Sequence, residues 1–122
     1  MRTWWIAIGL LAATPAVAAD QFDLVCTAKK SGTRYRIDLT RGEWCEGDGT
    51  VVKKVAEATT GMLFLARHEP SGVRDKTVRL WVNRNTGEWA DYSYDPAFDT
   101  TGSLKKGFCQ PASFSGFPSP KF

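Results

Sequence analysis

The residues best suited to chemistry lie in one short segment, in which Glu43, Glu46 and Asp48 surround Cys45. Grouped carboxylates could bind Ca²⁺, but that ion takes about six to eight oxygens, and the spacing is not that of an EF-hand. A glycosidase would need two of them facing each other across a cleft, which so small a domain rarely contains. The cluster therefore supports only a weak enzyme hypothesis, and we expect neither a metal nor a cofactor.

No other residue set is typical of catalysis. His68 is the only histidine, so a multi-histidine metal site cannot be built, and its neighbours Glu69 and Pro70 indicate a solvated loop. Cys45 lacks the local signatures of cysteine hydrolases. We therefore predict that the protein is not an enzyme and has no catalytic residues.

The N-terminus has the parts of a secretory signal peptide. Arg2 supplies a positive charge, an apolar run extends from Trp4 to Ala13, and Pro15 and small residues up to Ala19 follow. The apolar run is too short to span a bilayer core of about 30 Å. We expect residues 1–19 to be cleaved and the mature chain to be periplasmic or secreted.

Three cysteines then enter an oxidising compartment, where an odd count allows one bridge and leaves one thiol over. Spacing alone cannot choose among the three pairings. Cys26–Cys109 is favoured because it would join the first strand to the last, and Cys26–Cys45 is the alternative. The remaining cysteine could be buried, or it could link two chains into a dimer.

The charge of the mature chain is close to balanced. The whole chain has 16 basic and 13 acidic residues, and loss of Arg2 leaves 15 against 13, a net charge of about +2. The longest basic runs are the pairs Lys29-Lys30, Lys53-Lys54 and Lys105-Lys106. Nucleic-acid binders usually carry a stronger basic stripe, so we expect no nucleic acid as partner, and the absence of a long apolar run predicts no membrane span.

Period-2 alternation predicts an all-β domain over residues 20–110. Turn signals occur at Ser31-Gly32, at 40–42, at 46–49 and most clearly at 83–87. The strands are expected at 22–27, 34–39, 43–45, 50–58, 62–66, 77–82, 89–94 and 104–110, with 50–58 ambiguous and 62–66 covered on both faces. About seven short strands without helical periodicity indicate a small antiparallel β-barrel or β-sandwich. Residues 111–122 form a Pro/Phe-rich C-terminal tail that we expect to pack on the domain.

Aromatic residues supply the candidate binding sites. Gly42-Glu43-Trp44 and Gly87-Glu88-Trp89 repeat one turn chemistry, which would place Trp44 and Trp89 at equivalent strand starts. They could form a binding ridge, although aromatics after a glycine turn also fix strand register, the interpretation we favour. A small apolar ligand carrier would instead line its interior with Trp81, Trp89, Tyr92 and Phe64.

Several segments resemble a group of small uncharacterised exported proteins of Gram-negative bacteria, a resemblance that implies no particular activity. They are 22–26, 35–39, 44–48, 83–87 and 114–118, in this order. A weaker likeness is to the periplasmic inhibitors of c-type lysozyme, which are small exported β-barrels. Ser31-Gly32-Thr33-Arg34-Tyr35 is similar to their Ser-Gly-x-x-Tyr motif, which implies a role for Ser31 and Tyr35 in the lysozyme cleft.

Export, small size, a disulfide and many aromatics without a catalytic set predict a non-enzymatic binding domain of the bacterial envelope. A protein partner is the leading expectation. A small apolar ligand carrier and a lysozyme inhibitor are the alternatives.

Overall fold

The computed structural model describes residues 20–98 and 101–118 and shows an all-β protein. The predicted signal peptide, residues 1–19, and the last four residues of the predicted tail lie outside this description. The strands are β1 (Gln21–Ala28), β2 (Ser31–Asp38), β3 (Glu43–Glu46), β4 (Lys53–Lys54), β5 (Glu57–Ala58), β6 (Met62–His68), β7 (Thr77–Asn83), β8 (Glu88–Tyr94) and β9 (Ser103–Ala112).

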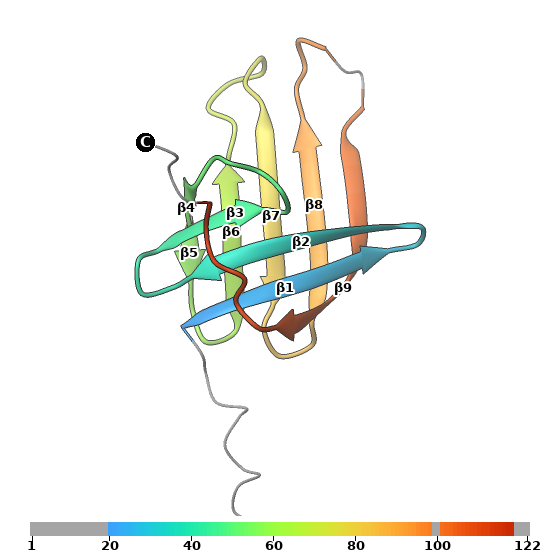
Figure 1. Ribbon diagram of the computed structural model, residues 1–122. Helices are drawn as coiled ribbons and strands as arrows, with labels where there is room; N and C mark the ends of the chain where they lie inside the picture. The colour runs from blue at the N-terminus through green and yellow to red at the C-terminus, as the bar shows by residue number, and fades with distance from the viewer. Residues whose placement is uncertain (1–19, 99–100, 119–122) are drawn as a thin grey trace, which may run out of the picture.

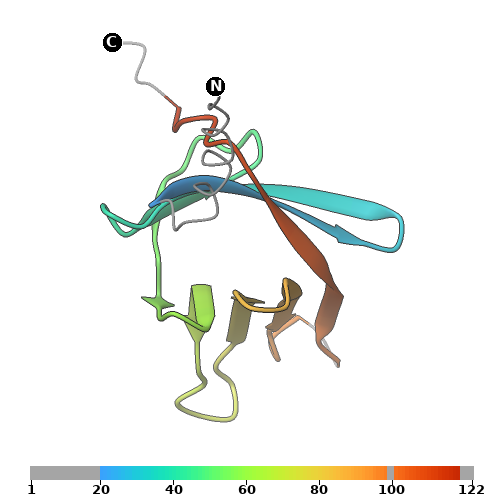
Figure 2. The ribbon, with the colours of Figure 1, turned by 90° about the horizontal axis from the view of Figure 1, so that it is seen from below.

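All nine strands belong to one antiparallel sheet with the order β4-β3-β2-β1-β9-β8-β7-β6-β5. The sheet curls into a half-barrel of two layers, in which β1, β2 and β3 cross over β6, β7 and β8 (Figures 1 and 2). β9 joins the layers, because its residues 103–108 pair with β8 and its residues 108–112 pair with β1. The predicted all-β class and antiparallel pairing are confirmed.

The two edge strands β4 and β5 come from almost continuous sequence, separated only by Val55 and Ala56. The amide of Val55 donates to the carbonyl of Gly42 at 2.8 Å, and that of Ala56 donates to the carbonyl of Phe64 at 3.0 Å. This short segment therefore bridges the two ends of the sheet order. Residues 50–58, predicted as one strand, instead form two short strands that pair with different neighbours, which raises the strand number to nine.

Gly107 makes the sharp passage of β9 between the layers possible. A Cβ atom at this position would overlap the carbonyl oxygen of Thr27, so only glycine lets β9 approach β1 so closely. The neighbouring residue Phe108 pairs with both Glu88 on β8 and Thr27 on β1. The corner of the half-barrel therefore lies at Gly107 and Phe108.

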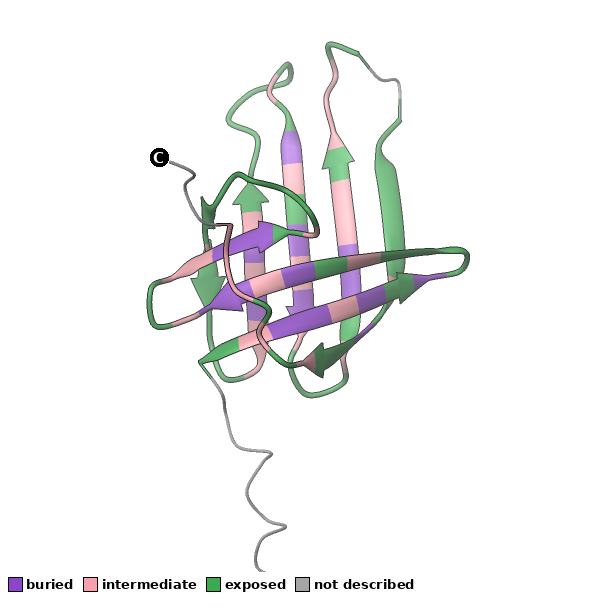
Figure 3. Cartoon of the chain, in the orientation of Figure 1, coloured by how far each residue is buried: buried purple, intermediate pink, exposed green. Residues whose placement is uncertain are grey.

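The core between the layers is built around three aromatic side chains. Tyr35, Trp44 and Trp89 are at most 2 % exposed, and the ring of Tyr35 packs edge-on against Trp44 at 5.8 Å and Trp89 at 6.3 Å between centroids. Figure 3 shows buried segments concentrated on β1 to β3 and β6 to β8, whereas the first half of β9 is exposed. Leu63 and Leu65 of β6 add aliphatic side chains to this core.

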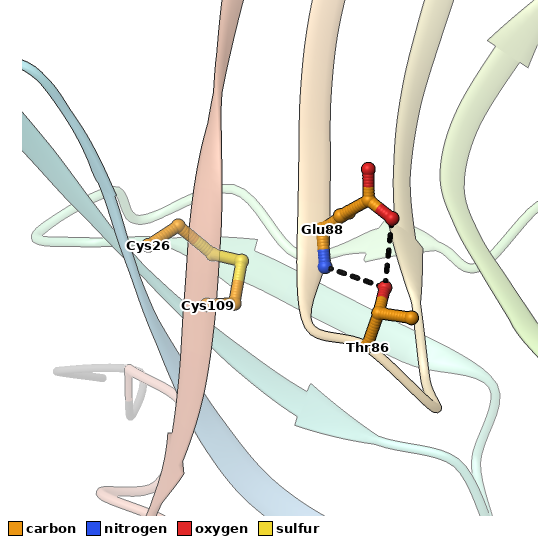
Figure 4. Close-up of a disulfide and its surroundings, with 4 residues drawn as sticks. All are labelled: Cys26, Thr86, Glu88 and Cys109. Carbon is orange, nitrogen blue, oxygen red and sulfur yellow. Dashed lines mark hydrogen bonds between the residues drawn. A yellow bond between two sulfur atoms is a disulfide. The ribbon is translucent and has the colours of Figure 1, made fainter.

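Cys26 and Cys109 lie directly opposite each other on β1 and β9 and form a disulfide (Figure 4). The favoured pairing is confirmed, and Cys45 is free and buried, so the alternative Cys26–Cys45 bridge is wrong. The bridge spans 83 residues of sequence. In the chain-entropy model a loop of this length contributes roughly 4–5 kcal/mol to stability.

Two predicted turns are confirmed and one is displaced. Gly42 and Gly87 have φ angles of 66° and 83°, the left-handed backbone that glycine adopts without a steric penalty. The first hairpin turns at Lys29-Lys30 and not at Ser31-Gly32, because Ala28 pairs with Ser31 and Thr27 with Gly32. Figure 4 shows the second glycine turn, where the Thr86 hydroxyl donates to the Glu88 carboxylate at 3.1 Å and accepts from the Glu88 amide at 3.2 Å.

The C-terminal tail lies on the outer face of β1 and β2. The Ser115 hydroxyl and amide donate to the Asp23 carboxylate at 2.6 and 3.2 Å, and the Arg36 guanidinium donates to the carbonyl of Gly116 at 2.9 Å. Asp23 is fully buried and also accepts from Arg34 at 2.6 Å. The described part of the tail packs on the domain, and it begins at residue 113 because β9 extends to Ala112.

No helix in the described parts of the chain is long and apolar enough to cross a membrane.

Candidate binding face

Strand register separates the aromatic residues of β6, β7 and β8 into an inner and an outer group. Trp89 is buried in the core, so its neighbour Ala90 points the opposite way. Trp81 pairs directly with Ala90 and with Phe64. Phe64 and Trp81 therefore share the outer face of the sheet, and both are only partly buried.

Tyr92 joins these two residues because it lies two positions after Ala90 on β8 and so points to the same face. It pairs with Arg79 of β7, and Arg79 pairs with Arg67 of β6. We call Phe64, Trp81, Tyr92, Arg67 and Arg79 the outer aromatic face. Its members come from three adjacent strands that the core of the half-barrel holds in place.

The two arginines lie over the aromatic rings. The Arg67 guanidinium is 4.6 Å from the ring centroid of Phe64, and that of Arg79 is 5.9 Å from the ring centroid of Tyr92. Distances in this range are typical of cation–π contacts. The outer aromatic face thus places guanidinium groups over flat apolar rings.

Carboxylates hold both guanidinium groups. Arg67 pairs with Glu57 at 2.7 Å, and Arg79 donates to both carboxylate oxygens of Glu69 at 2.7 and 2.9 Å. The hydrogen bonds from Arg79 hold the pKa of the Glu69 carboxyl below its ordinary value. The resulting two-pronged pair fixes the plane of the guanidinium, so Arg79 is already oriented in the free protein.

Three of the predicted binding residues lie elsewhere. Trp44, Trp89 and Tyr35 are buried and pack against one another, so the predicted tryptophan ridge does not reach the surface. The predicted carrier lining is also wrong, since of Phe64, Trp81, Trp89 and Tyr92 only Trp89 faces the interior. These positions fix the core, as expected for aromatics that set strand register.

Two polar atoms in this core have no hydrogen-bond partner among the described residues, the hydroxyl of Tyr35 and the indole nitrogen of Trp89. Burial, with a smaller contribution from the negative charge of Asp91, raises the pKa of Tyr35 far above its ordinary value. The phenol is therefore neutral at physiological pH. Neither group is accessible to a partner at the surface.

The Ser31–Tyr35 motif lines a surface groove through only part of its length. Gly32, Thr33 and Arg34 border a cavity of about 560 Å³ whose lining also includes Glu46 and Asp48. Ser31 is exposed at the start of β2, whereas Tyr35 points into the core. The structure therefore does not bring Ser31 and Tyr35 together on one surface.

The carboxylate cluster of the sequence is divided in the structure. Glu46 and Asp48 share the groove wall, but Glu43 pairs with Arg41 at 3.2 Å. Within residues 20–98 and 101–118, no three acidic, cysteine or histidine side chains are placed to hold a metal ion. His68 is exposed at the end of β6, and its ring nitrogen Nε2 lies 3.0 Å from a carboxylate oxygen of Asp75 in the loop that follows.

Cys45 lies on the outer side of the layer formed by β1, β2 and β3, where it pairs with Arg36 of β2. The thiol is fully buried, and burial raises its pKa. A thiol in this environment is a poor nucleophile, because the thiolate is the reactive form. The sequence did not indicate Arg67 or Arg79 as site residues. Arg79 alternates with the inward Leu80 and Val82 on β7, which was visible in the sequence. Arg67 has the same parity as the inward Leu63 and Leu65, and it reaches the outer face only because the register of β6 shifts between Phe64 and Ala66.

No family model, curated protein or solved structure matches the chain. A functional assignment therefore depends on the geometry of the molecule itself.

Proposed function

We propose that the mature chain is an exported, non-enzymatic binding domain that recognises a protein partner of the bacterial envelope through its outer aromatic face. The observation that carries this proposal is the position of Trp81 on the outer face, directly opposite Phe64 and diagonal to Tyr92. Tryptophan, tyrosine and arginine are the residue types most enriched among interface hot spots. The outer aromatic face contains all three.

The face is also well prepared for binding. The ion pairs of Arg67 and Arg79 hold these long side chains over the rings before any partner arrives. Ordering a flexible side chain on binding costs roughly 0.5–1.5 kcal/mol. A partner that docks on this face avoids much of that cost for the two arginines.

The alternatives receive less support from the geometry. A small apolar ligand carrier needs interior space, but Trp44, Trp89 and Tyr35 fill the core by packing on one another. A lysozyme inhibitor would use Ser31 and Tyr35, and Tyr35 is buried. A lysozyme assay with excess protein tests this second alternative directly, and retained lysozyme activity would eliminate it.

Crosslinking in intact cells, followed by affinity purification, tests the proposal. The wild-type protein is compared with Trp81→Ser and with the control Arg74→Ser, which changes an exposed residue of the 69–76 loop. We expect one discrete envelope protein whose recovery falls at least tenfold for Trp81→Ser and is unchanged for Arg74→Ser. Equal recovery with all three proteins would refute a role for the outer aromatic face.

A further inference from the structure

A second surface feature lies at the corner of the half-barrel, between the tip of the β1–β2 hairpin and the start of β9. It is a groove of about 550 Å³, lined by Ala28, Lys29, Lys30, Ser31, Leu104, Lys105 and Lys106. Two lysine pairs that are 75 residues apart in sequence meet here, because β9 pairs with β1 next to the hairpin. We call this feature the lysine groove.

The lysine groove concentrates positive charge. Its lining includes four lysines and no acidic residue, whereas the whole mature chain has a net charge of only about +2. All four lysines are exposed, and none of them takes part in a salt bridge within the described residues. The nearest carboxylate by strand register is Asp91, which pairs with Lys105 across β8 and β9.

Exposed apolar side chains flank this charge. Leu104 and Phe108 are 56 % and 61 % exposed, and both lie on the same side of β9 as Lys106, since all three alternate along the strand. Exposed apolar side chains that lie close together, unlike single scattered ones, often mark an interaction site. The edge of the groove therefore combines apolar and cationic groups along one strand.

We propose that the lysine groove, with Leu104 and Phe108, binds the surface of a membrane that contains anionic lipids. Lysines near an anionic bilayer are attracted without specific geometry, and exposed Leu and Phe side chains add affinity by entering the interface between headgroups and acyl chains. A site built to grip a single phosphate or carboxylate would favour arginine, whose planar fork binds these groups with two hydrogen bonds. The groove has only lysines, which matches a diffuse negative surface.

The lysine groove adjoins the outer aromatic face along β9, where Leu104 pairs with Tyr92 and Lys106 pairs with Ala90. The two proposals still depend on different residues, so Trp81 and the four lysines can be changed independently. A loss of protein crosslinking in Trp81→Ser with unchanged vesicle binding would separate the two proposals. A loss of vesicle binding in the lysine variants with unchanged protein crosslinking would separate them equally well.

Vesicle co-sedimentation tests the proposal. The purified mature protein is mixed with vesicles of phosphatidylcholine alone or with one third phosphatidylglycerol, at low and high salt. Each lysine near an anionic surface strengthens binding roughly five-fold, so Lys105→Gln with Lys106→Gln should weaken binding to the anionic vesicles roughly 25-fold. The control pair Arg74→Gln with Lys76→Gln removes the same charge from the exposed 69–76 loop and should change binding less than two-fold.

Phe108→Ser provides a second variant that does not change charge. It should reduce the part of the binding that persists at high salt, where charge attraction is screened. Equal binding to neutral and anionic vesicles, or equal loss with the control pair, would overturn the proposal. Binding to a soluble polyanion such as polyphosphate without binding to anionic vesicles would overturn it as well. Near-ultraviolet circular dichroism confirms that each variant is folded.

Discussion

Phe64 on β6 and Trp81 on β7 lie directly opposite each other on the outer face of the sheet. Each is only partly buried, although residues of this size usually contribute to a core when they occur in the middle of a strand. The inner face at the same level is occupied by Leu63 and Val82, which are 1 % and 3 % exposed. The inner side chains at this level already form the core, so the aromatic pair is not needed there, and this is the basis of our proposal that it binds a partner.

The two tryptophans on either side of the second glycine turn should differ sharply in their effect on stability. Trp89→Ala removes a buried core ring and should lower the free energy of unfolding by about 3–5 kcal/mol. Trp81→Ser changes a partly exposed outer residue and should cost about 1 kcal/mol or less. Urea denaturation followed by circular dichroism measures both, and a large loss for Trp81→Ser would place that side chain in the core.

The Cys26–Cys109 bridge should account for a large share of the stability. Replacing both cysteines by Ser should lower the free energy of unfolding by roughly 4 kcal/mol, because the unfolded chain regains the freedom of a long loop. Calorimetry of the double variant measures this loss. Cys45→Ser is the matched control, and it should leave the bridge intact by mass spectrometry.

The C-terminal tail should protect Cys45. Asp23→Asn removes the charged acceptor that holds both Ser115 and Arg34, and the loss of charged hydrogen bonds should cost about 2 kcal/mol. We expect faster alkylation of Cys45 at neutral pH as the tail loosens. Asp20→Asn, a change of an exposed aspartate near the same strand, should leave the alkylation rate unaltered. Identical rates for the two variants would contradict a protective tail.

The surface loop between β6 and β7 should lose order only in strong acid. The amide of Ser71 and the ring of His68 hydrogen-bond the Asp75 carboxylate and lower its pKa from 3.8 to about 2. A depressed pKa means that the stabilising contribution is complete above 3.8 and is lost as the pH falls through about 2. Carboxyl NMR titration measures the pKa, and His68→Gln should raise it. An Asp75 that titrates near 4 in both proteins would contradict these contacts.

The sequence predicted the local features of the fold well. The alternation of Val78, Leu80 and Val82 with Arg79 and Trp81 correctly predicted a strand, and it already implied that Trp81 faces away from the core. Treating Trp81 and Trp89 as lining one interior overlooked the register of their hairpin, in which Trp89 pairs with Val82. A two-residue period shows which residues of one strand share a face. Only the pairing register shows which face of the next strand lies on the same side of the sheet.

Features that depend on distant parts of the chain could not be predicted. The valines of residues 50–58 favour strand in general, but nothing local shows that the first half pairs with β3 and the second half with β6. The first turn occurs at Lys29, which has a φ of 45°, although Ser31-Gly32 has the more usual turn residues. The meeting of the two lysine pairs likewise depends on the pairing of β1 with β9.

A photo-crosslinking amino acid in place of Tyr92 tests the central claim most directly, because this position belongs to the outer aromatic face and its replacement leaves Trp81 in place. Thr40, exposed in the turn between β2 and β3, is the matched control position. In irradiated cells we predict one discrete crosslinked species from position 92 and none from position 40, with the species lost when Trp81→Ser is added. Absence of a species at position 92, or its persistence with Trp81→Ser, would contradict the assignment of this face to binding.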